Sequence, residues 1–244
     1  MYGYVGKILR VNLTSGTCKV ESTDVETAKK FIGGRGFGTY LMSKETDPAI
    51  DALSEENKIM IVTGPLTGTA TPTGGRYMVV TKSPLTGAIA CSNSGGYWGA
   101  ELKFAGYDAI IIEGKSEKPV YIMMEDDKVE IRDAAHVWGK LVRETTEILE
   151  NETPDKSKVL TIGPAGEKQS LLAAIMNDND RAAGRSGVGA VMGSKNLKAI
   201  TVRGTSKPEA ADSEVLKDVN KKVMQQIKEN GVTGQGLPTY GTAV

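Results

Sequence analysis

Four glycine-rich segments, three of them carrying arginine, are the residues of this sequence best suited to chemistry. They are GGRGFG at 33–38, TGGRY at 73–77, NSGGY at 93–97 and RAAGRSG at 181–187. Glycine lets the backbone approach a ligand closely, and the planar guanidinium of arginine donates paired hydrogen bonds to phosphate oxygens. Because the chain carries 30 basic and 30 acidic residues, these arginines are not part of a general cationic excess. The pattern predicts a cradle for the phosphates of a large anionic cofactor.

Two of these segments also stand where helices are expected to begin. Ser94 is a suitable N-cap for a helix over 97–105, and segment 181–187 precedes a helical stretch at 188–197. Free N–H groups and the helix dipole favour an anion at such a terminus. The alternative is that the glycines only make tight turns and allow close packing, which is the better interpretation of any single segment. Four segments together favour the cradle.

The elements that must position these segments form a strand-rich pattern. Strands are predicted at 6–13, 19–21, 58–62, 76–81, 109–113, 120–124, 128–131 and 199–204, and helices at 25–31, 97–105, 137–149 and 213–230.

The second half of the chain resembles the first. The hairpin at 120–131 resembles the opening hairpin, and 159–164 resembles 61–65. Residues 187–195 resemble 36–44, although out of order relative to the other pairs. No regular alternation of strands and helices requires a parallel, doubly wound sheet. We therefore predict an α+β fold, a duplicated unit with two β-sheets and flanking helices.

The C-terminal part differs in composition. Residues 205–212 are polar and predict a linker, and the helix at 213–230 has one apolar stripe. We therefore divide the chain into a cofactor-holding domain at 1–208 and a segment at 209–244. This segment is predicted to be a linker and the start of a second, helical domain that is cut short. Its apolar stripe is expected to associate with other protein surfaces.

Composition excludes several classes of function. A formal net charge of zero and 5% aromatic residues argue against a nucleic-acid-binding surface. No apolar run approaches the length of a membrane span, and residues 1–6 show no secretory signal. The expectation is a cytoplasmic protein without membrane contact.

Common metal and nucleotide motifs do not fit. Cys18 and Cys91 are the only cysteines and cannot supply the four thiolates of an iron–sulfur cluster, while the single His136 argues against a Ser-His-Asp triad. The GVGAVMG run at 187–193 follows a polar stretch instead of a strand, unlike a dinucleotide fingerprint. Asp178 and Asp180 have the chemistry to ligate a divalent cation, but they more readily cap a turn.

Residues 1 to about 204 closely resemble the N-terminal domain of the tungsten-dependent aldehyde ferredoxin oxidoreductases. The segments that carry the resemblance are TGPLTG at 63–68, TGGRY at 73–77, TKSPLTG at 81–87, NSGG at 93–96, FAGYD at 104–108, IGPAGE at 162–167, AIMND at 174–178 and GSKNLKA at 193–199. So many long motifs in the same order make the resemblance specific.

The resemblance implies a base domain on which two pyranopterins, joined through tungsten or in some relatives molybdenum, lie as one anionic cofactor. The positions that match cofactor contacts are Arg76, Asn93 and Gly95 on one side, and Arg181, Ala182, Gly184 and Arg185 on the other. Carbonyl groups at the positions of Asn93 and Ala182 match those that hold a magnesium ion between the pterin phosphates. For Arg35 a role in the turn is as good an interpretation.

The resemblance also implies what lies outside this chain. In the family the [4Fe–4S] cysteines and the acid–base residues belong to later domains, so no catalytic residue is expected here. The whole enzyme would oxidise aldehydes to carboxylic acids and pass electrons to ferredoxin, and the present chain alone would be inactive. Its expected partners are ferredoxin, the aldehyde, the remaining domains and a second copy in a homo-oligomer. The alternative is a non-catalytic scaffold or accessory subunit that binds a phosphate-bearing ligand or a partner protein.

Overall fold

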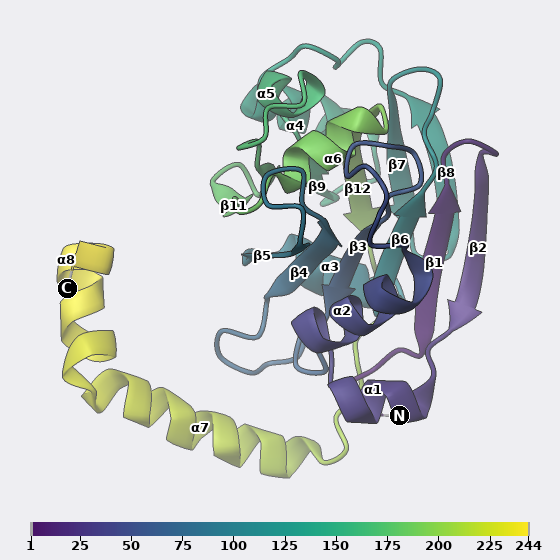
Figure 1. Cartoon of the computed structure of the whole chain (residues 1–244). Helices are drawn as coiled ribbons and strands as arrows, with labels where there is room; N and C mark the ends of the chain where they lie inside the picture. The colour runs from purple at the N-terminus through teal and green to yellow at the C-terminus, as the bar shows by residue number, and fades with distance from the viewer. Residues whose placement is uncertain (1, 244) are drawn as a thin grey trace.

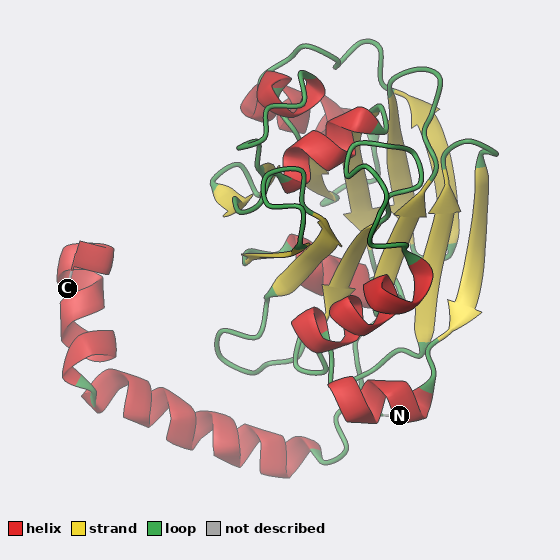
Figure 2. Cartoon of the chain, in the orientation of Figure 1, coloured by secondary structure: helices red, strands yellow, loops and turns green. Residues whose placement is uncertain are grey.

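Two six-stranded mixed sheets pack face to face in the computed structural model, which describes residues 2–243 (Figures 1 and 2). The first sheet has the order β2 (Thr17–Ser22), β1 (Lys7–Asn12), β6 (Ala109–Glu113), β3 (Ile59–Thr63), β4 (Tyr77–Lys82), β5 (Ile89–Ser94). The second has the order β8 (Lys128–Asp133), β7 (Val120–Glu125), β12 (Leu197–Arg203), β9 (Lys158–Thr161), β10 (Ile175–Asn177), β11 (Arg181–Ala183).

The two sheets have the same topology. Strands β7 to β12 occupy, in the second sheet, the same positions that β1 to β6 occupy in the first, so that β7 corresponds to β1 and β12 to β6. The single parallel pairing also recurs, between β1 and β6 in one sheet and between β7 and β12 in the other. These features confirm the predicted α+β fold with a duplicated unit and two sheets.

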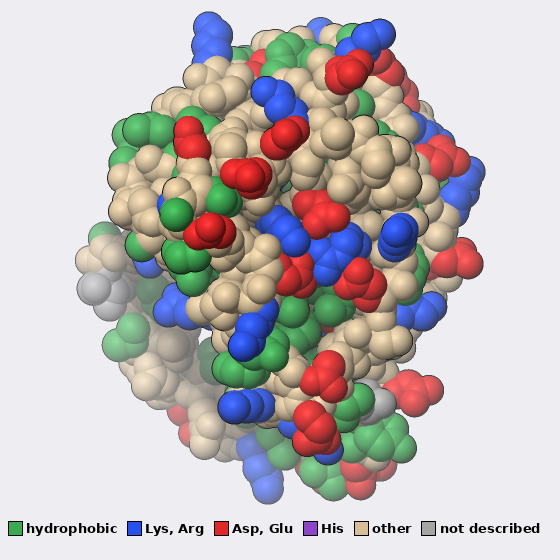
Figure 3. All heavy atoms as spheres, turned by 45° about the vertical axis from the view of Figure 1, so that its right-hand side comes forward, with side chains coloured by type: hydrophobic (Ala, Val, Ile, Leu, Met, Phe, Trp, Pro, Cys, Tyr) green, Lys and Arg blue, Asp and Glu red, His purple; other side chains and the backbone are tan. Residues whose placement is uncertain are grey.

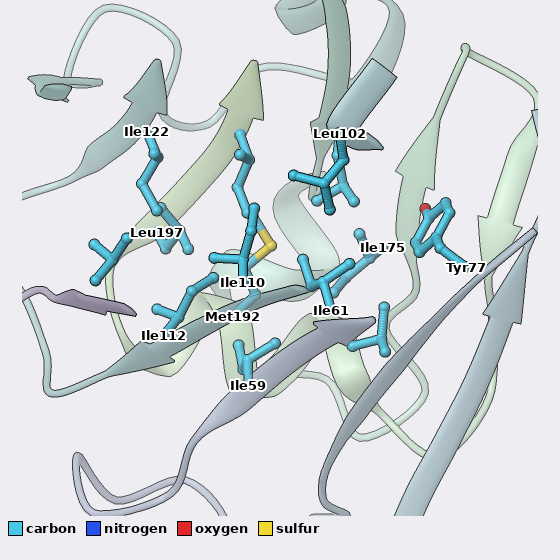
Figure 4. Close-up of a cluster of buried hydrophobic side chains, with 14 of the residues drawn as sticks. Ile59, Ile61, Tyr77, Leu102, Ile110, Ile112, Ile122, Ile175, Met192 and Leu197 are labelled. Atoms are coloured by element: carbon cyan, nitrogen blue, oxygen red, sulfur yellow. The ribbon is translucent and has the colours of Figure 1, made fainter. Parts of the chain in front are cut away.

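Alternating side chains divide the interior into three cores. The largest lies between the sheets, where Leu9, Ile61 and Ile110 meet Ile122 and Ile200; Figure 4 shows part of it. Neighbouring residues on the same strands, such as Ile8, Met60 and Ile111, point to the opposite face of the first sheet. Since side chains alternate along a strand, a strand buried on both faces reads as a continuous apolar run. Residues 109–112 of β6 are such a run.

Helices cover both outer faces and also close the space between the sheets. They are α1 (Val25–Phe31), α2 (Gly34–Glu45), α3 (Trp98–Phe104), α4 (Val142–Glu152), α5 (Pro164–Glu167), α6 (Val188–Ser194), α7 (Ser213–Glu229) and α8 (Leu237–Tyr240). Helix α2 packs on the outer face of the first sheet and α4 on that of the second. Helices α3 and α6 instead contribute Trp98, Leu102, Val191 and Met192 to the core between the sheets.

Several local predictions were wrong, and tertiary contacts explain why. Helix α2 was not predicted, because Gly34, Gly36 and Gly38 disfavour a helix. A Cβ atom on Gly38 would lie 2.7 Å from Cγ2 of Val80, so glycine is what lets this helix lie directly on the sheet. The helix predicted at 137–149 begins at Val142 instead.

The proposed likeness of 36–44 to 187–195 does not reflect equivalent structure. Helix α2 connects β2 to β3, whereas α6 connects β11 to β12 and so takes the place of α3 in the duplicated unit. Strands β5, β10 and β11 were also missed, because two of them are only three residues long and rich in polar or small side chains.

Helix α7 extends from the body of the molecule and buries none of its residues (Figure 1). Val215, Val219 and Met224 on its apolar stripe are 58%, 47% and 42% exposed. A groove of about 890 Å³ runs along this helix beside Ala70 and Pro72. Among residues 2–243, no helix is long and apolar enough to cross a membrane.

Among residues 2–243, three lysines are completely buried, and one of these three has no carboxylate partner. Lys103 pairs with Asp108 and Lys198 with Glu167, each at 2.5 Å. Lys195 instead donates hydrogen bonds to the backbone oxygens of Gly114 (2.9 Å) and Glu55 (3.2 Å). Burial lowers the pKa of the Lys195 ammonium from 10.5 to about 8.

This shift predicts a pH dependence of stability. Below pH 8 Lys195 is charged in both the folded and the unfolded chain, and the cost of burying the charge is fully present. Between pH 8 and 10.5 the unfolded chain binds more protons, so the free energy of unfolding should rise with pH, by up to about 3 kcal/mol from this group. Urea unfolding across this range checks the rise. The Lys195→Met variant should show a flatter dependence; equal slopes would contradict the assignment.

Candidate functional site

The glycine-rich segments gather where the edges of the two sheets meet. Strand β5 is the edge of the first sheet and β11 the edge of the second, and they lie side by side (Figure 1). The backbone N–H of Arg185 donates to Oγ of Ser92 at 2.9 Å, and the hydroxyl of Ser83 donates to the carbonyl of Ser186 at 2.9 Å. Residues about a hundred positions apart are thereby held at one edge.

Two hollows open at this edge. One of about 760 Å³ is lined by Arg76, Gly95 and Arg181, together with Tyr97 and Asp178. The other, of about 410 Å³, is lined by glycines of segment 33–38 and by Arg76 and Asn93. Arg76 therefore borders both hollows. The larger groove along α7 contains none of the predicted site residues.

The structure brings together some of the predicted site residues more closely than others. Arg76 immediately precedes β4, Asn93 lies in β5, and Gly95 follows it. Arg181 and Ala182 form the start of β11, opposite Met176 and Asn177 of β10. Ala182, Gly184 and Arg185 are exposed beside these hollows but line neither of them.

The arginines of the glycine-rich segments differ from the others in charge pairing. Arg10, Arg132, Arg143 and Arg203 each form an ion pair with a carboxylate. Across residues 2–243, Arg35, Arg76, Arg181 and Arg185 form none, and all four are exposed. Elsewhere opposite charges intermingle, as on the face in Figure 3. Unpaired guanidinium groups at one edge favour an anionic ligand there.

The glycines at the first hollow are required by packing between loops, in addition to letting a ligand approach the backbone. A Cβ atom on Gly75 would lie 2.7 Å from the carbonyl oxygen of Gly96, and one on Gly95 would lie 2.9 Å from a guanidinium nitrogen of Arg76. Gly96 has φ +89, and its Cβ would lie 2.2 Å from Oδ2 of Asp178. The turn-and-packing interpretation is therefore correct for these glycines, and it holds the loops close around the hollow.

Replacing Gly96 by alanine should cost more stability than a positive φ alone explains. The clash with Asp178 should add about 2 kcal/mol to the conformational cost, because a well-packed loop must move. Gly106 is a matched control, since it has φ +92 and a Cβ atom added there would meet nothing within 4 Å. Urea unfolding of the Gly96→Ala and Gly106→Ala variants measures the difference. Equal losses of stability in the two variants would show that the loop around Gly96 can move away from Asp178 without cost.

The helix-start argument for anion binding is weaker than the sequence suggested. Helices α3 and α6 have only seven residues each. The N-cap of α3 is Tyr97 and makes no side-chain cap, whereas the hydroxyl of Ser94 donates to Oδ1 of Asn177 at 2.7 Å. The prediction of Ser94 as an N-cap is wrong.

Asp178 stabilises a turn, which is the role that the sequence favoured for it over metal binding. Its φ is +46, and its carboxylate accepts hydrogen bonds from the backbone N–H of Tyr97 (2.6 Å) and from the amide of Asn177 (2.8 Å). In residues 2–243, no group of three or more His, Cys, Asp or Glu side chains is placed to hold a metal ion. Sequence reasoning missed Asn177, because a polar residue after the short run 174–176 looks like the start of a loop.

Backbone oxygens are the remaining donors suited to a hard cation. Asn93 and Ala182 lie in β5 and β11, each of which is an edge strand of its own sheet. An edge strand presents part of its backbone N–H and C=O groups away from that sheet. The side-chain amide of Asn93 donates to the carbonyl of Tyr77 at 3.1 Å, which fixes this residue on the strand. Carbonyl ligands, phosphate oxygens and a divalent cation are chemically matched. The donor set at this edge thus fits an anionic cofactor with a bridging magnesium ion.

Comparison with known proteins shows the relationship of the chain. The family model for the N-terminal domain of aldehyde ferredoxin oxidoreductase matches residues 8–204. The tungsten-containing aldehyde ferredoxin oxidoreductase of Pyrococcus abyssi is 61% identical over 245 residues, covering 100% of this chain and 40% of the relative. The enzyme of the same name from Thermococcus kodakarensis is 57% identical with the same coverage.

A solved structure shows the same fold. The active-site complex BamBC of benzoyl-coenzyme A reductase, with 1,5-dienoyl-CoA, matches with a TM-score of 0.90 and 40% identity, over 93% of this chain and 35% of that one. The chain spans about 40% of the length of the aldehyde oxidoreductases that it matches. The chain belongs to the aldehyde ferredoxin oxidoreductase family and corresponds to its N-terminal domain.

Proposed function

We propose that this chain is the cofactor-holding part of a tungsten-dependent enzyme that oxidises aldehydes to carboxylic acids with ferredoxin as electron acceptor. The observation that carries the proposal is that Arg76 and Arg181, neither of which forms an ion pair with a carboxylate among residues 2–243, line one hollow at the edge between the two sheets. The 61% identity to a tungsten-containing aldehyde ferredoxin oxidoreductase supports the same chemistry.

The residues of this chain would hold the cofactor and not react. Arg76 and the loop at Gly95 would bind one phosphate-bearing end, with Asn93 beside them. Residues 181–185, including Arg181, Ala182, Gly184 and Arg185, would bind the other end. Backbone carbonyls of Asn93 and Ala182 would ligate the magnesium ion between the phosphates. When bound, the tungsten (or molybdenum) bis-pyranopterin supplies the two-electron redox chemistry.

Charge balance explains why this arrangement suits the ligand. A phosphate brought into a partly closed hollow loses water, and guanidinium groups replace that hydration with charge-assisted hydrogen bonds. Among residues 2–243, no group of three or more His, Cys, Asp or Glu side chains is placed to hold a metal ion. From the family resemblance we propose that aldehyde binding, a [4Fe–4S] cluster and ferredoxin contact reside in further domains, and that the present chain alone is inactive. Residues 209–244 would lead into those domains.

A second reaction class is suggested by the structural relative, because this fold also serves benzoyl-coenzyme A reductase. An aliphatic sulfonate oxidoreductase subunit of Pyrococcus furiosus is likewise 42% identical, over 89% of this chain. Both identities are lower than those to the aldehyde oxidoreductases. These identities favour aldehyde oxidation. We also propose that the protein is cytoplasmic and a homo-oligomer, as the sequence and the family resemblance led us to expect. A scaffold or accessory subunit that binds a phosphate-bearing ligand is the remaining alternative.

The test is to purify the complete natural protein from cells supplied with tungstate, then measure tungsten and pterin per chain and aldehyde-dependent reduction of ferredoxin. We expect bound tungsten and pterin, with ferredoxin reduced only when an aldehyde is present. Bound metal and pterin without aldehyde oxidation would favour another reaction of the family. A protein without metal or pterin, purified without loss of fold, would support the scaffold.

A further inference from the structure

Asn177 links the two sheets directly beneath the first hollow. It lies at the end of β10 in the second sheet and is 1% exposed. Its Oδ1 accepts hydrogen bonds from the hydroxyls of Tyr77 in β4 and Ser94 in β5, both at 2.7 Å. Its Nδ2 donates to the carbonyl of Gly95 and to the carboxylate of Asp178, both at 2.8 Å. Every hydrogen-bonding position of the amide is used.

The bonds of Asn177 continue to both arginine-bearing loops. Asp178 accepts the backbone N–H of Tyr97 at 2.6 Å, so the two residues together hold both ends of the Gly95–Gly96 turn. Arg76 packs against Gly95, since a Cβ atom added to this glycine would lie 2.9 Å from the guanidinium group. In the other direction, Arg181 follows Asp178 by three residues. Arg76 and Arg181 line the same hollow.

We propose that Asn177, acting with Asp178, is a positioning residue that sets Arg76 and Arg181 at the separation required by an anionic ligand with two phosphate-bearing ends. This inference rests on the proposed function of the site. Asn177 itself lines neither hollow. It fixes the first sheet against the second where loops from both sheets line a single hollow.

An amide is the side chain that these four neighbours require. Aspartate has the same shape but only accepts hydrogen bonds when ionised, so it would face the Gly95 carbonyl and the Asp178 carboxylate without a donor. The Asn177→Asp variant should therefore push the Gly95–Gly96 turn away from β10. The two arginines would then lose their relative position while keeping their charge.

The chain offers a matched control in Asn57. It is also completely buried, and its Nδ2 donates to the carbonyls of Ala52 (2.6 Å) and Lys82 (3.1 Å). Its Oδ1 accepts hydrogen bonds from Thr81 and the backbone of Lys58. It lines neither hollow at the edge between the sheets. Asn57→Asp therefore reproduces the chemical change of Asn177→Asp away from the arginines.

The test measures tungsten and pterin per folded chain, together with the unfolding temperature, in the complete natural protein with each substitution. We expect a similar loss of thermal stability in both variants. Tungsten and pterin should fall at least about tenfold in Asn177→Asp and stay at the wild-type level in Asn57→Asp. Equal cofactor content in the two variants, whether high or low, would overturn the positioning role.

Two milder variants keep the test decisive if Asn177→Asp does not fold. Tyr77→Phe and Ser94→Ala each remove one donor to Asn177, and together they should speed the release of tungsten during mild heating by several-fold. Unchanged release in the double variant would overturn the proposal. Failure of the proposed function has a different signature, because wild-type protein would then hold no tungsten, or Arg76→Ala and Arg181→Ala would hold as much as wild type.

Discussion

Replacing Arg76 or Arg185 by alanine in the complete natural protein should lower its content of tungsten and pterin before it alters selectivity among aldehydes. A charge-assisted hydrogen bond to phosphate is worth about 1.5–3 kcal/mol, and its loss leaves a partly buried anion under-neutralised. Retention of the cofactor should therefore fall by roughly tenfold or more. Metal analysis and pterin release from the purified variants measure the effect.

Arg132→Ala is the control for this experiment. Arg132 lies on the edge strand β8, far from β5 and β11 in strand order, and pairs with Glu130. A partly exposed pair of this kind contributes little, about 0–1 kcal/mol, so cofactor content should not change. Full tungsten occupancy in both Arg76→Ala and Arg185→Ala would reject the assignment of these arginines to the cofactor.

Lys198→Met should strongly destabilise the fold. Lys198 and Glu167 form a buried pair, with side chains 0% and 6% exposed, and Lys198 also donates to the carbonyl of Lys140 at 2.9 Å. Removing the ammonium leaves the Glu167 carboxylate buried without its cation, which costs about 3–5 kcal/mol. Urea unfolding measures this loss.

Two further variants separate the charge effect from the loss of packing. Adding Glu167→Gln to Lys198→Met should recover part of the stability, because the stranded charge is then removed. Lys128→Met breaks an exposed pair with Glu130 and should change stability by about 1 kcal/mol or less. If Lys198→Met lowered the free energy of unfolding no more than Lys128→Met does, the buried pair would make no contribution to stability.

Long apolar runs and their caps made much of the fold predictable. Strand β6 and helix α1 have the bounds that the sequence indicated, because residues 109–112 of β6 are an uninterrupted aliphatic run and α1 has Asp24 as its N-cap. The duplicated unit was also visible, since equivalent hairpins and strand ends keep similar residues. Helix α2 could not be predicted, because tertiary contacts, and not local propensity, account for its glycines: Gly38 lies against Val80 of the sheet and Gly36 against Phe31 of α1.

The candidate site, too, could be predicted only in part from the sequence. The residue types and the resemblance pointed to arginine and glycine positions, and Arg76, Gly95 and Arg181 do line one hollow. Their assignment to cofactor binding stays a prediction. Sequence spacing could not show that Ala182, Gly184 and Arg185 stand outside the two hollows. Nor could it identify Asn177, whose four partners come from positions next to it and about a hundred residues away.

The sequence by itself determined the duplicated α+β plan and the family, because these depend on residue type and local order. Only the tertiary structure decided which loops share a hollow, which arginines lack a carboxylate partner and which polar residue joins the sheets. Those properties arise when β5 and β11, remote in the chain, meet as edge strands. The packing of the two sheets brings these strands together, and this determines which side chains lie at the shared edge.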